Sequence, residues 1–381
     1  MRLGRKHLFV FGVESTFRTA HGARKGCTTD QFLRRYQQRV LTTRSVQCVG
    51  IDLDFTHVPP KMFGEGLGAM ERYAAAVLEL AVPRAPYVKF QEAYYQAPGD
   101  DDYVAMLIRL IKHSHHLGLL VGLDGKKNEI DRSMEQWGDE VFGRLGVDFC
   151  TVTPYLGNTY KAWLKWLKGG RAAISMILTS NPEALLQQQE LKNGLLVYEQ
   201  QAIWTREWNE EMVELTEGAG AIGGVIGATK PGQAARAREL AGDKVFVLSP
   251  GYGPGQGGGA DGAVEAIVTS VGGVNGIVNN SSGSTKWSWL DKETKQPKPG
   301  DSVAYVQETI EATNTDLNAA LVRRIGKPLE EILVFPSQLR HTRCECGDAD
   351  CDGTAEHSGL SRGEANDALA DIGRNIGEPG L

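Results

Sequence analysis

The chain has 381 residues, of which 41% are hydrophobic and 23% charged, and its formal net charge at neutral pH is -6. This balance is ordinary for a soluble globular protein, and the negative charge excludes a general attraction to nucleic acid or to an anionic membrane. We find no apolar run of 18 residues, so the sequence predicts no transmembrane helix. The N-terminal run from His7 to Val13 is too short for a signal peptide. We therefore expect a cytoplasmic protein.

Residues 1–28 are basic and loosely patterned, which predicts an extension outside the folded core. From Asp30 to Leu41, apolar residues recur at helical spacing and predict an amphipathic helix. Strand-like and helix-like segments then alternate. The predicted strands are 45–52, 87–91, 119–124, 148–153, 173–179, 224–228, 245–248 and 276–279. The predicted helices are 71–80, 103–116, 132–143, 160–167, 182–215, 231–240, 263–271 and 303–325.

Eight strand–helix units over about 280 residues predict a (β/α)₈ TIM barrel, which needs parallel and nearly continuously apolar strands. The barrel domain is expected over residues 29–326, followed by a C-terminal extension over 327–381. A doubly wound open sheet is the competing fold, and the number of units disfavours it.

The strand predicted over 119–124 releases charges where it ends. Asp124 and Lys126 are followed closely by Lys127 and Glu129. Side chains two apart on an extended chain point to the same side, so Asp124 and Lys126 are expected to face one site. A lysine held charged by carboxylates can give its proton to a carbanion. An isolated Asp-x-Lys sequence is more often part of a solvated turn. A catalytic role for Asp124 and Lys126 therefore depends on whether polar residues also end the other predicted strands.

Polar residues also end the other predicted strands. In a (β/α)₈ barrel the carboxyl ends of all strands open at one mouth, where barrel enzymes perform their chemistry. The residues expected at this mouth are Asp52, Lys89, Asp124, Lys126, Thr153, Thr179, Ser180, Asn181, Thr229 and Asn279.

Seven stretches together resemble the orotidine 5′-phosphate decarboxylase family in its longer bacterial form. They follow the family order within residues 30–285, and they are 49–52, 87–91, 123–126, 151–157, 178–182, 225–229 and 250–258. The resemblance implies a homodimeric barrel enzyme that converts orotidine 5′-monophosphate to uridine monophosphate. It implies a small-molecule nucleotide substrate, with no nucleic-acid or membrane partner and no cofactor or metal in catalysis.

The resemblance also implies roles for residues at matching positions. Lys126 would protonate C6 of the pyrimidine while Asp124 presses on the substrate carboxylate. Lys89 would orient these charges, Asp52 would hold the ribose hydroxyls, and Glu129 would reach into the neighbouring subunit's site. Further substrate contacts are expected from Thr179, Ser180, Pro250, Gly251, Tyr252, Gln256, Gly257 and Lys286. Binding energy from the remote phosphate would offset the repulsion between the two carboxylates.

Two departures from the family pattern leave the substrate open. The fourth charged position is Glu129 where the family has Asp, and Asp131 is an alternative for that role. The family's phosphate-binding arginine is replaced by Ser282 or Gly283, so Lys286 would have to reach the phosphate as a point charge. Another pyrimidine nucleotide or a related carboxylate is therefore an alternative substrate for the same Asp–Lys pair.

A cluster of soft metal ligands lies near the C-terminus. Cys344, Cys346, Cys351 and His357 could hold a structural zinc ion as a Cys₃His site, although their spacing is not the common C-x₂-C pattern. Free thiols in a mobile tail are the alternative. A non-catalytic zinc-containing binding or assembly protein is therefore a further hypothesis. The Gly-rich run 253–258 formally fits a dinucleotide motif, but no acid stands between Glu265 and Asp291 to bind a ribose.

Overall fold

The computed structural model describes residues 31–57, 60–253, 257–280, 282–332 and 334. The predicted N-terminal extension, Gln256 and the Cys344, Cys346, Cys351 and His357 cluster lie outside these residues, so the domain boundaries and the zinc site stay predictions. In the part of the chain that is described, no helix combines the length and the apolar character needed to span a bilayer.

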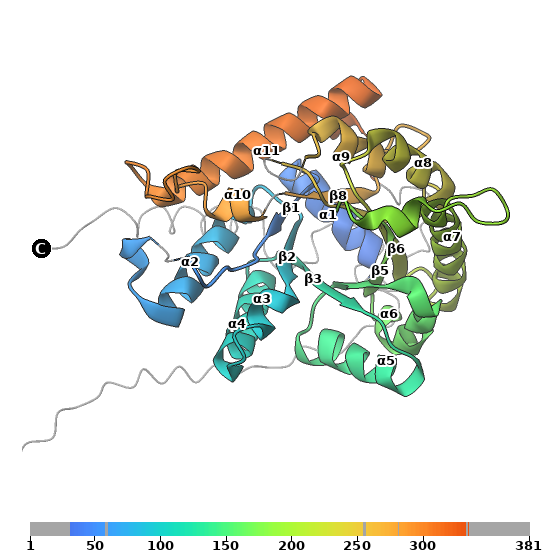
Figure 1. The fold of residues 1–381 in the computed structure, drawn as a ribbon, viewed down its shortest axis with the longest axis horizontal. Coiled ribbons are helices and arrows are strands. Elements are labelled where there is room, and N and C mark those ends of the chain that lie inside the picture. Colours follow the sequence, from blue (N-terminus) through green and yellow to red (C-terminus); the bar gives the residue numbers. More distant parts are fainter. Residues whose placement is uncertain (1–30, 58–59, 254–256, 281, 333, 335–381) are drawn as a thin grey trace, which may run out of the picture. The chain divides into compact units, whose positions relative to one another are not determined.

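Within the described residues, eight parallel strands close into a barrel, each pairing with its neighbour in sequence and β8 pairing with β1 (Figure 1). The strands are β1 (Gln47–Gly50), β2 (Tyr87–Gln91), β3 (Leu120–Lys127), β4 (Phe149–Val152), β5 (Ala172–Leu178), β6 (Ala221–Ile226), β7 (Val247–Ser249) and β8 (Gly276–Asn279). Their residues are almost all buried, as expected for parallel strands covered on both faces. The predicted (β/α)₈ barrel is confirmed, and the open sheet is wrong.

Helices follow the strands around the outside of the barrel (Figure 1). The α-helices are α1 (Phe32–Thr43), α2 (Gly66–Ala81), α3 (Glu92–Gln96), α4 (Asp101–His116), α5 (Asp131–Gly138), α6 (Leu164–Leu167), α7 (Val197–Leu215), α8 (Pro231–Ala241), α9 (Ala260–Ile267), α10 (Ser282–Lys286) and α11 (Ser302–Ile325). Short 3₁₀ turns span Lys61–Phe63, Pro154–Leu156, Thr159–Trp163, Ala184–Gln188 and Leu329–Glu331, and a π-helical turn spans Asp139–Arg144. Beyond α11, Leu329, Ile332 and Val334 are buried in the core.

Helix α1 closes the amino-terminal end of the barrel. Phe32 and Tyr36 each place their ring edge-on to Phe246 with centroids 5.1 Å apart, and both rings are fully buried. The Tyr36 hydroxyl donates a hydrogen bond to the carbonyl of Gly276 at 2.8 Å. Beside this aromatic plug, Arg171 pairs at 2.6 Å with the buried carboxylate of Asp148. The carboxyl ends of the strands therefore form the open end of the barrel.

The predicted helix over residues 182–215 is wrong in its first half. A 3₁₀ turn ends at Gln188, and α7 begins only at Val197. Between them the chain turns at Gly194, whose φ of 80° is favourable only for glycine, and Glu190 bridges to Leu196. The Glu199 carboxylate then accepts the backbone N–H of Leu196 at 2.9 Å and starts the helix.

Candidate active site

Asp124 and Lys126 lie on a bulge near the carboxyl end of β3. Leu123 pairs with Cys150 and Lys127 pairs with Val152, so four steps along β3 lie opposite two steps along β4. Lys126 has a φ of 45°, in the left-handed region that side chains rarely adopt. The predicted strand end at Asp124 is therefore wrong: the strand continues to Lys127. Asp124 and Lys126 therefore point toward the same site because of this bulge, and not because they are two apart on a regular extended strand.

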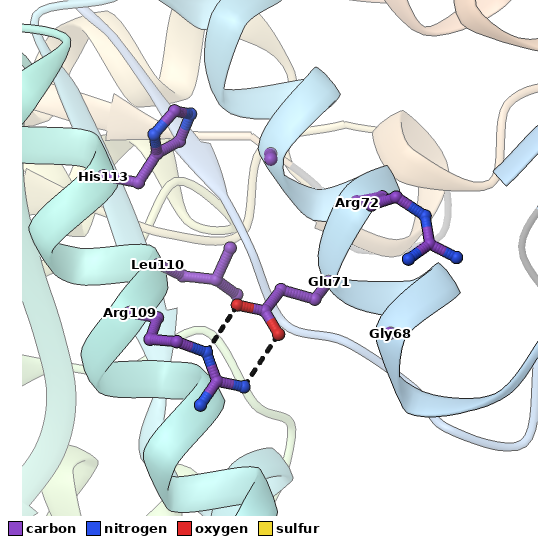
Figure 2. A pocket seen from close by; sticks show the side chains of 7 residues that line it. Gly68, Glu71, Arg72, Arg109, Leu110 and His113 are labelled. Carbon is purple, nitrogen blue, oxygen red and sulfur yellow. Dashed lines mark hydrogen bonds and ion pairs between the residues drawn. The ribbon is translucent and has the colours of Figure 1, made fainter. Parts of the chain in front are cut away.

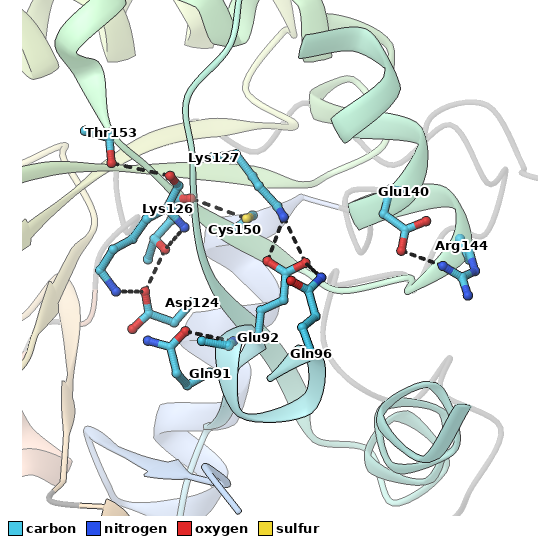
Figure 3. A network of polar contacts seen from close by, with 12 residues as sticks. Gln91, Glu92, Gln96, Asp124, Lys126, Lys127, Glu140, Arg144, Cys150 and Thr153 are labelled. Atoms are coloured by element: carbon cyan, nitrogen blue, oxygen red, sulfur yellow. Dashed lines mark hydrogen bonds and ion pairs between the residues drawn. The ribbon is translucent and has the colours of Figure 1, made fainter. Parts of the chain in front are cut away.

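Three charged side chains from β2 and β3 meet at this bulge (Figure 3 shows Asp124 and Lys126). The Asp124 carboxylate accepts Lys126 Nζ at 2.5 Å on one oxygen and Lys89 Nζ at 3.1 Å on the other. The Thr151 hydroxyl donates to Asp124 Oδ1 at 2.9 Å and accepts the backbone N–H of Lys126 at 3.0 Å. The Lys89 side chain is 4% exposed and that of Lys126 is 47% exposed. Lys126 is thus the most exposed member of this cluster, and Asp124 is 16% exposed.

The cluster keeps its charges ionised at neutral pH. Burial alone raises the pKa of Asp124, but the ammonium groups of Lys89 and Lys126 outweigh burial and hold its pKa well below the usual range. Burial alone lowers the pKa of Lys89, but Asp124 and Asp52 outweigh it and raise the pKa above its ordinary value. An anionic Asp124 therefore stands between two ammonium groups.

Asp52 follows β1 and joins the cluster from the side of the neighbouring strand. Its Oδ1 accepts the backbone N–H of Gln91 at 3.0 Å, and its charge acts on Lys89. Residues predicted at the ends of three consecutive strands are therefore brought together, although their catalytic and binding roles stay predictions.

A cavity of about 760 Å³ opens beside Asp52. It lies over the ends of β1, β7 and β8, and its polar lining there includes Asp54, Asn279 and Asn280. Its lining also includes Trp287 and three lysines, Lys292, Lys295 and Lys298. Asp52 is common to this cavity and to the charged cluster, so one elongated ligand could reach both.

The ends of β5, β6 and β7 pack closely against one another. Gly251 has a φ of 90°, and a Cβ there would come within 2.7 Å of Ser180 Cβ, so this position needs glycine. The carbonyl of Pro250 accepts the N–H of Ala228 at 2.8 Å. Thr179 donates its N–H to Gln187 Oε1 at 2.9 Å.

The β7 loop places two further predicted residues. Gly257 adopts a φ of 83° in this loop. The Tyr252 hydroxyl donates to Asp316 on α11 at 2.8 Å, and Tyr252 lines the cavity. The substrate contacts predicted for these loop residues remain untested.

Lys286 ends α10 with its side chain completely buried. Burial lowers the pKa of this lysine to about 8, although Asp52 partly opposes the effect. Because the side chain is enclosed in the observed conformation, its role in binding phosphate stays a prediction.

The burial of Lys286 should make the free energy of unfolding depend on pH. Its folded-state pKa of about 8 lies below the ordinary value of 10.5, so the unfolded chain binds the proton more tightly. Relative to a Lys286→Met variant, the wild-type protein should gain stability as pH rises from about 8 to about 10.5, by on the order of 3 kcal/mol. Urea unfolding of both proteins across this range measures the difference. A difference independent of pH would contradict the expected shift.

Glu129 and Asp131 follow the bulge without joining the cluster by any contact that we observe among the described residues. Glu129 is half-buried, and its Oε2 accepts the N–H of Ile130 at 3.0 Å. Asp131 is exposed and begins α5 with a φ of 41°. The predicted role of Glu129 across a subunit interface is therefore untested.

A second hollow lies outside the barrel between α2 and α4 (Figure 2). Its volume is about 420 Å³, and its charged groups largely satisfy each other, because Arg109 pairs with Glu71 through two hydrogen bonds of 2.7 Å. It has no contact with the strand ends, and we assign it no role.

Sequence reasoning missed an ion pair behind the charged cluster. Lys127 Nζ lies 2.7 Å from Glu92 Oε2, and both side chains are about 93% buried. The sequence does show a lysine, Lys127, directly after an apolar strand. Its partner Glu92 belongs to the short helix α3, which the sequence pattern did not predict.

The sequence profile of the orotidine 5′-phosphate decarboxylase / HUMPS family matches residues 47–278 of this chain. An orotidine 5′-phosphate decarboxylase of Aromatoleum aromaticum is 34% identical over 215 residues, which are 56% of this chain and 74% of that protein. The enzyme of the same name from Bordetella pertussis is 29% identical over 287 residues, covering 74% of this chain and 99% of the relative.

Solved structures share the fold at lower identity. The structure of Leishmania donovani OMP decarboxylase aligns with a TM-score of 0.59 and 21% identity, covering 76% of this chain and 98% of that one. At this identity the likeness supports the barrel fold alone.

Proposed function

Because the chain belongs to the orotidine 5′-phosphate decarboxylase / HUMPS family, we propose that it is a carboxy-lyase that converts orotidine 5′-monophosphate to uridine 5′-monophosphate. This reaction would place it in pyrimidine nucleotide synthesis. The observation that carries the proposal is the Lys89–Asp124–Lys126 cluster at the open end of the barrel.

The proposed reaction uses these charges in one sequence of events. The bond between C6 and the carboxylate carbon breaks, carbon dioxide leaves, and the electron pair remains on C6. The Lys126 ammonium stabilises the resulting carbanion and transfers a proton to C6, and solvent then reprotonates the amine. The substrate supplies the electron pair and Lys126 the proton, so this scheme requires no cofactor.

Asp124 and Lys89 set the electrostatics of this step. The anionic Asp124 would repel the substrate carboxylate, and that repulsion is relieved as carbon dioxide departs. Lys89 is fixed behind Asp124 at 3.1 Å and keeps it ionised. The Asp52 carboxylate would accept hydrogen bonds from the ribose hydroxyls, and the adjoining cavity would hold the rest of the nucleotide.

An ultraviolet assay tests the proposed function directly. Purified protein is mixed with orotidine 5′-monophosphate, and the absorbance change that accompanies decarboxylation is followed, with uridine 5′-monophosphate identified by chromatography. Decay no faster than in buffer would reject this substrate.

A second candidate is decarboxylation of another pyrimidine nucleotide or related carboxylate. It is favoured by Glu129 in place of aspartate and by the burial of Lys286, the cation expected at the phosphate. A panel of carboxylated pyrimidine nucleotides separates the two candidates, and turnover of orotidine 5′-monophosphate alone would dismiss the second.

We also propose a homodimer in which Glu129 serves the neighbouring site. Lys126→Ala and Glu129→Ala variants should each lose most activity. After the two are unfolded together and refolded, mixed dimers should contain one site with both native residues. We expect the mixture to recover about a quarter of wild-type activity, because half of the dimers are mixed and each has one complete site. Sedimentation measures the oligomer, and the absence of recovery would contradict the shared site.

A further inference from the structure

The bulge that aims Lys126 is backed by a buried charged pair. Lys127 Nζ contacts both carboxylate oxygens of Glu92, at 2.8 and 2.7 Å, and lies 3.5 Å from the ring centroid of Trp137. Gln96 donates to Glu92 Oε1 at 2.9 Å. Figure 3 shows Lys127 and Lys126 leaving the strand toward different partners, Glu92 and Asp124.

This pair touches the backbone of the bulge itself. A Cβ added at Gly125 would meet Glu92 Oε2 at 2.8 Å and Lys127 Cε at 3.1 Å. Gly125 is the residue between Asp124 and Lys126, so the pair forms the wall against which the bulge rests. On the other side, Thr153 holds the carbonyl of Lys127 through its N–H at 3.0 Å.

The left-handed conformation of Lys126 needs such support. A non-glycine residue in this region costs on the order of 1 kcal/mol or more and persists only where its surroundings enforce it. A buried ion pair is itself expensive to assemble, and replacement by apolar residues is often neutral or stabilising. Stability alone therefore does not account for placing Lys127 and Glu92 next to the proposed proton donor.

We propose that Lys127 and Glu92 are positioning residues that hold the β3 bulge so that the Lys126 ammonium stays on Asp124 and faces the substrate. The inference rests on the proposed decarboxylation, and it assigns a role in that reaction to two residues that lie behind the charged cluster. Neither side chain is expected to touch the substrate, since both are almost fully buried.

The test compares Lys127→Met, Glu92→Gln and the conservative Lys127→Arg. In Lys127→Met and Glu92→Gln, kcat should fall about 10- to 100-fold, because a catalytic group misplaced by about 1 Å costs about that much. The KM and the affinity for uridine 5′-monophosphate should change less than about threefold, because neither residue is expected to touch the substrate. Lys127→Arg keeps the charge and should restore most of kcat. Equal kcat per folded molecule in Lys127→Met and wild type would overturn the proposal.

Arg171→Met is the matched control for stability. It removes one partner of another buried carboxylate, Asp148, at the closed end of the barrel, where Arg35 and His115 also contact Asp148. It should lower the melting temperature without lowering kcat per folded molecule. If Lys127→Met does not fold, Gly125→Ala supplies the second variant, because its methyl group displaces the Glu92 carboxylate and should lower kcat in the same way.

Crystal structures of wild type and Glu92→Gln separate this inference from the proposed function. The positioning role predicts that Lys126 leaves its left-handed conformation or its contact with Asp124 in the variant. An unchanged Lys126 overturns the inference whatever the substrate is, whereas a wild-type protein inactive on orotidine 5′-monophosphate rejects only the proposed function.

Discussion

Lys126→Met should abolish decarboxylation while leaving the fold intact. The substitution removes both the ammonium that stabilises the carbanion and the proton it receives, so we expect kcat/KM to fall by at least about 10⁴-fold. Stability should change less than on loss of Lys89, because the Lys126 side chain is 47% exposed and Asp124 keeps its ion pair with Lys89. Steady-state kinetics and thermal unfolding measure the two effects.

Lys161→Met is the matched control for this experiment. Lys161 also pairs with a carboxylate at 2.5 Å, that of Glu211, and its side chain is 50% exposed, but it lies on the helical layer away from the strand ends. It should retain wild-type kinetics. Activity of Lys126→Met within tenfold of wild type would refute its role as proton donor.

Lys89→Met should lose both activity and stability. Its side chain is 4% exposed and carries charge beside both Asp124 and Asp52, so its removal leaves the largely buried Asp124 without its main counter-charge. Breaking a buried pair by removing one partner costs about 3–5 kcal/mol. We expect a loss of that order in the free energy of unfolding at neutral pH, measured by urea denaturation, and a fall in kcat/KM of at least about 10²-fold.

The double variant Lys89→Met with Asp124→Asn separates the two losses. Removing the Asp124 charge as well should return part of the stability, because Asp124 is then no longer an uncompensated carboxylate. Activity should stay low, because the repulsion on the substrate carboxylate is also gone. A double variant as unstable as Lys89→Met would show that the pair is not what stabilises this region.

The pH dependence of the wild type follows from the same cluster. The pKa of Asp124 in the folded protein is depressed, so its contribution to stability is present above the ordinary carboxyl pKa and is lost as pH falls through the folded pKa. Lys89→Met should shrink this loss in acid, since it removes the larger of the two lysine charges that lower the pKa of Asp124.

The order of elements and the central motif could be predicted because they are local properties of the chain. Buried parallel strands are continuously apolar, and strands such as 87–91 and 276–279 therefore appeared with the bounds that the structure has. The charges after Leu123 stood out against that background, and the barrel geometry placed them together with Lys89 and Asp52.

Tertiary contacts decided what no local pattern encodes. The bulge at Lys126 depends on the pairing of β3 with β4, and the Lys127–Glu92 pair joins residues 35 positions apart. The burial of Lys286 depends on how α10 folds over the barrel mouth. The spacing of apolar residues and the positions of charged residues can be read from the sequence. The register of the β3 bulge and the burial of a charged side chain arise only when distant segments pack together.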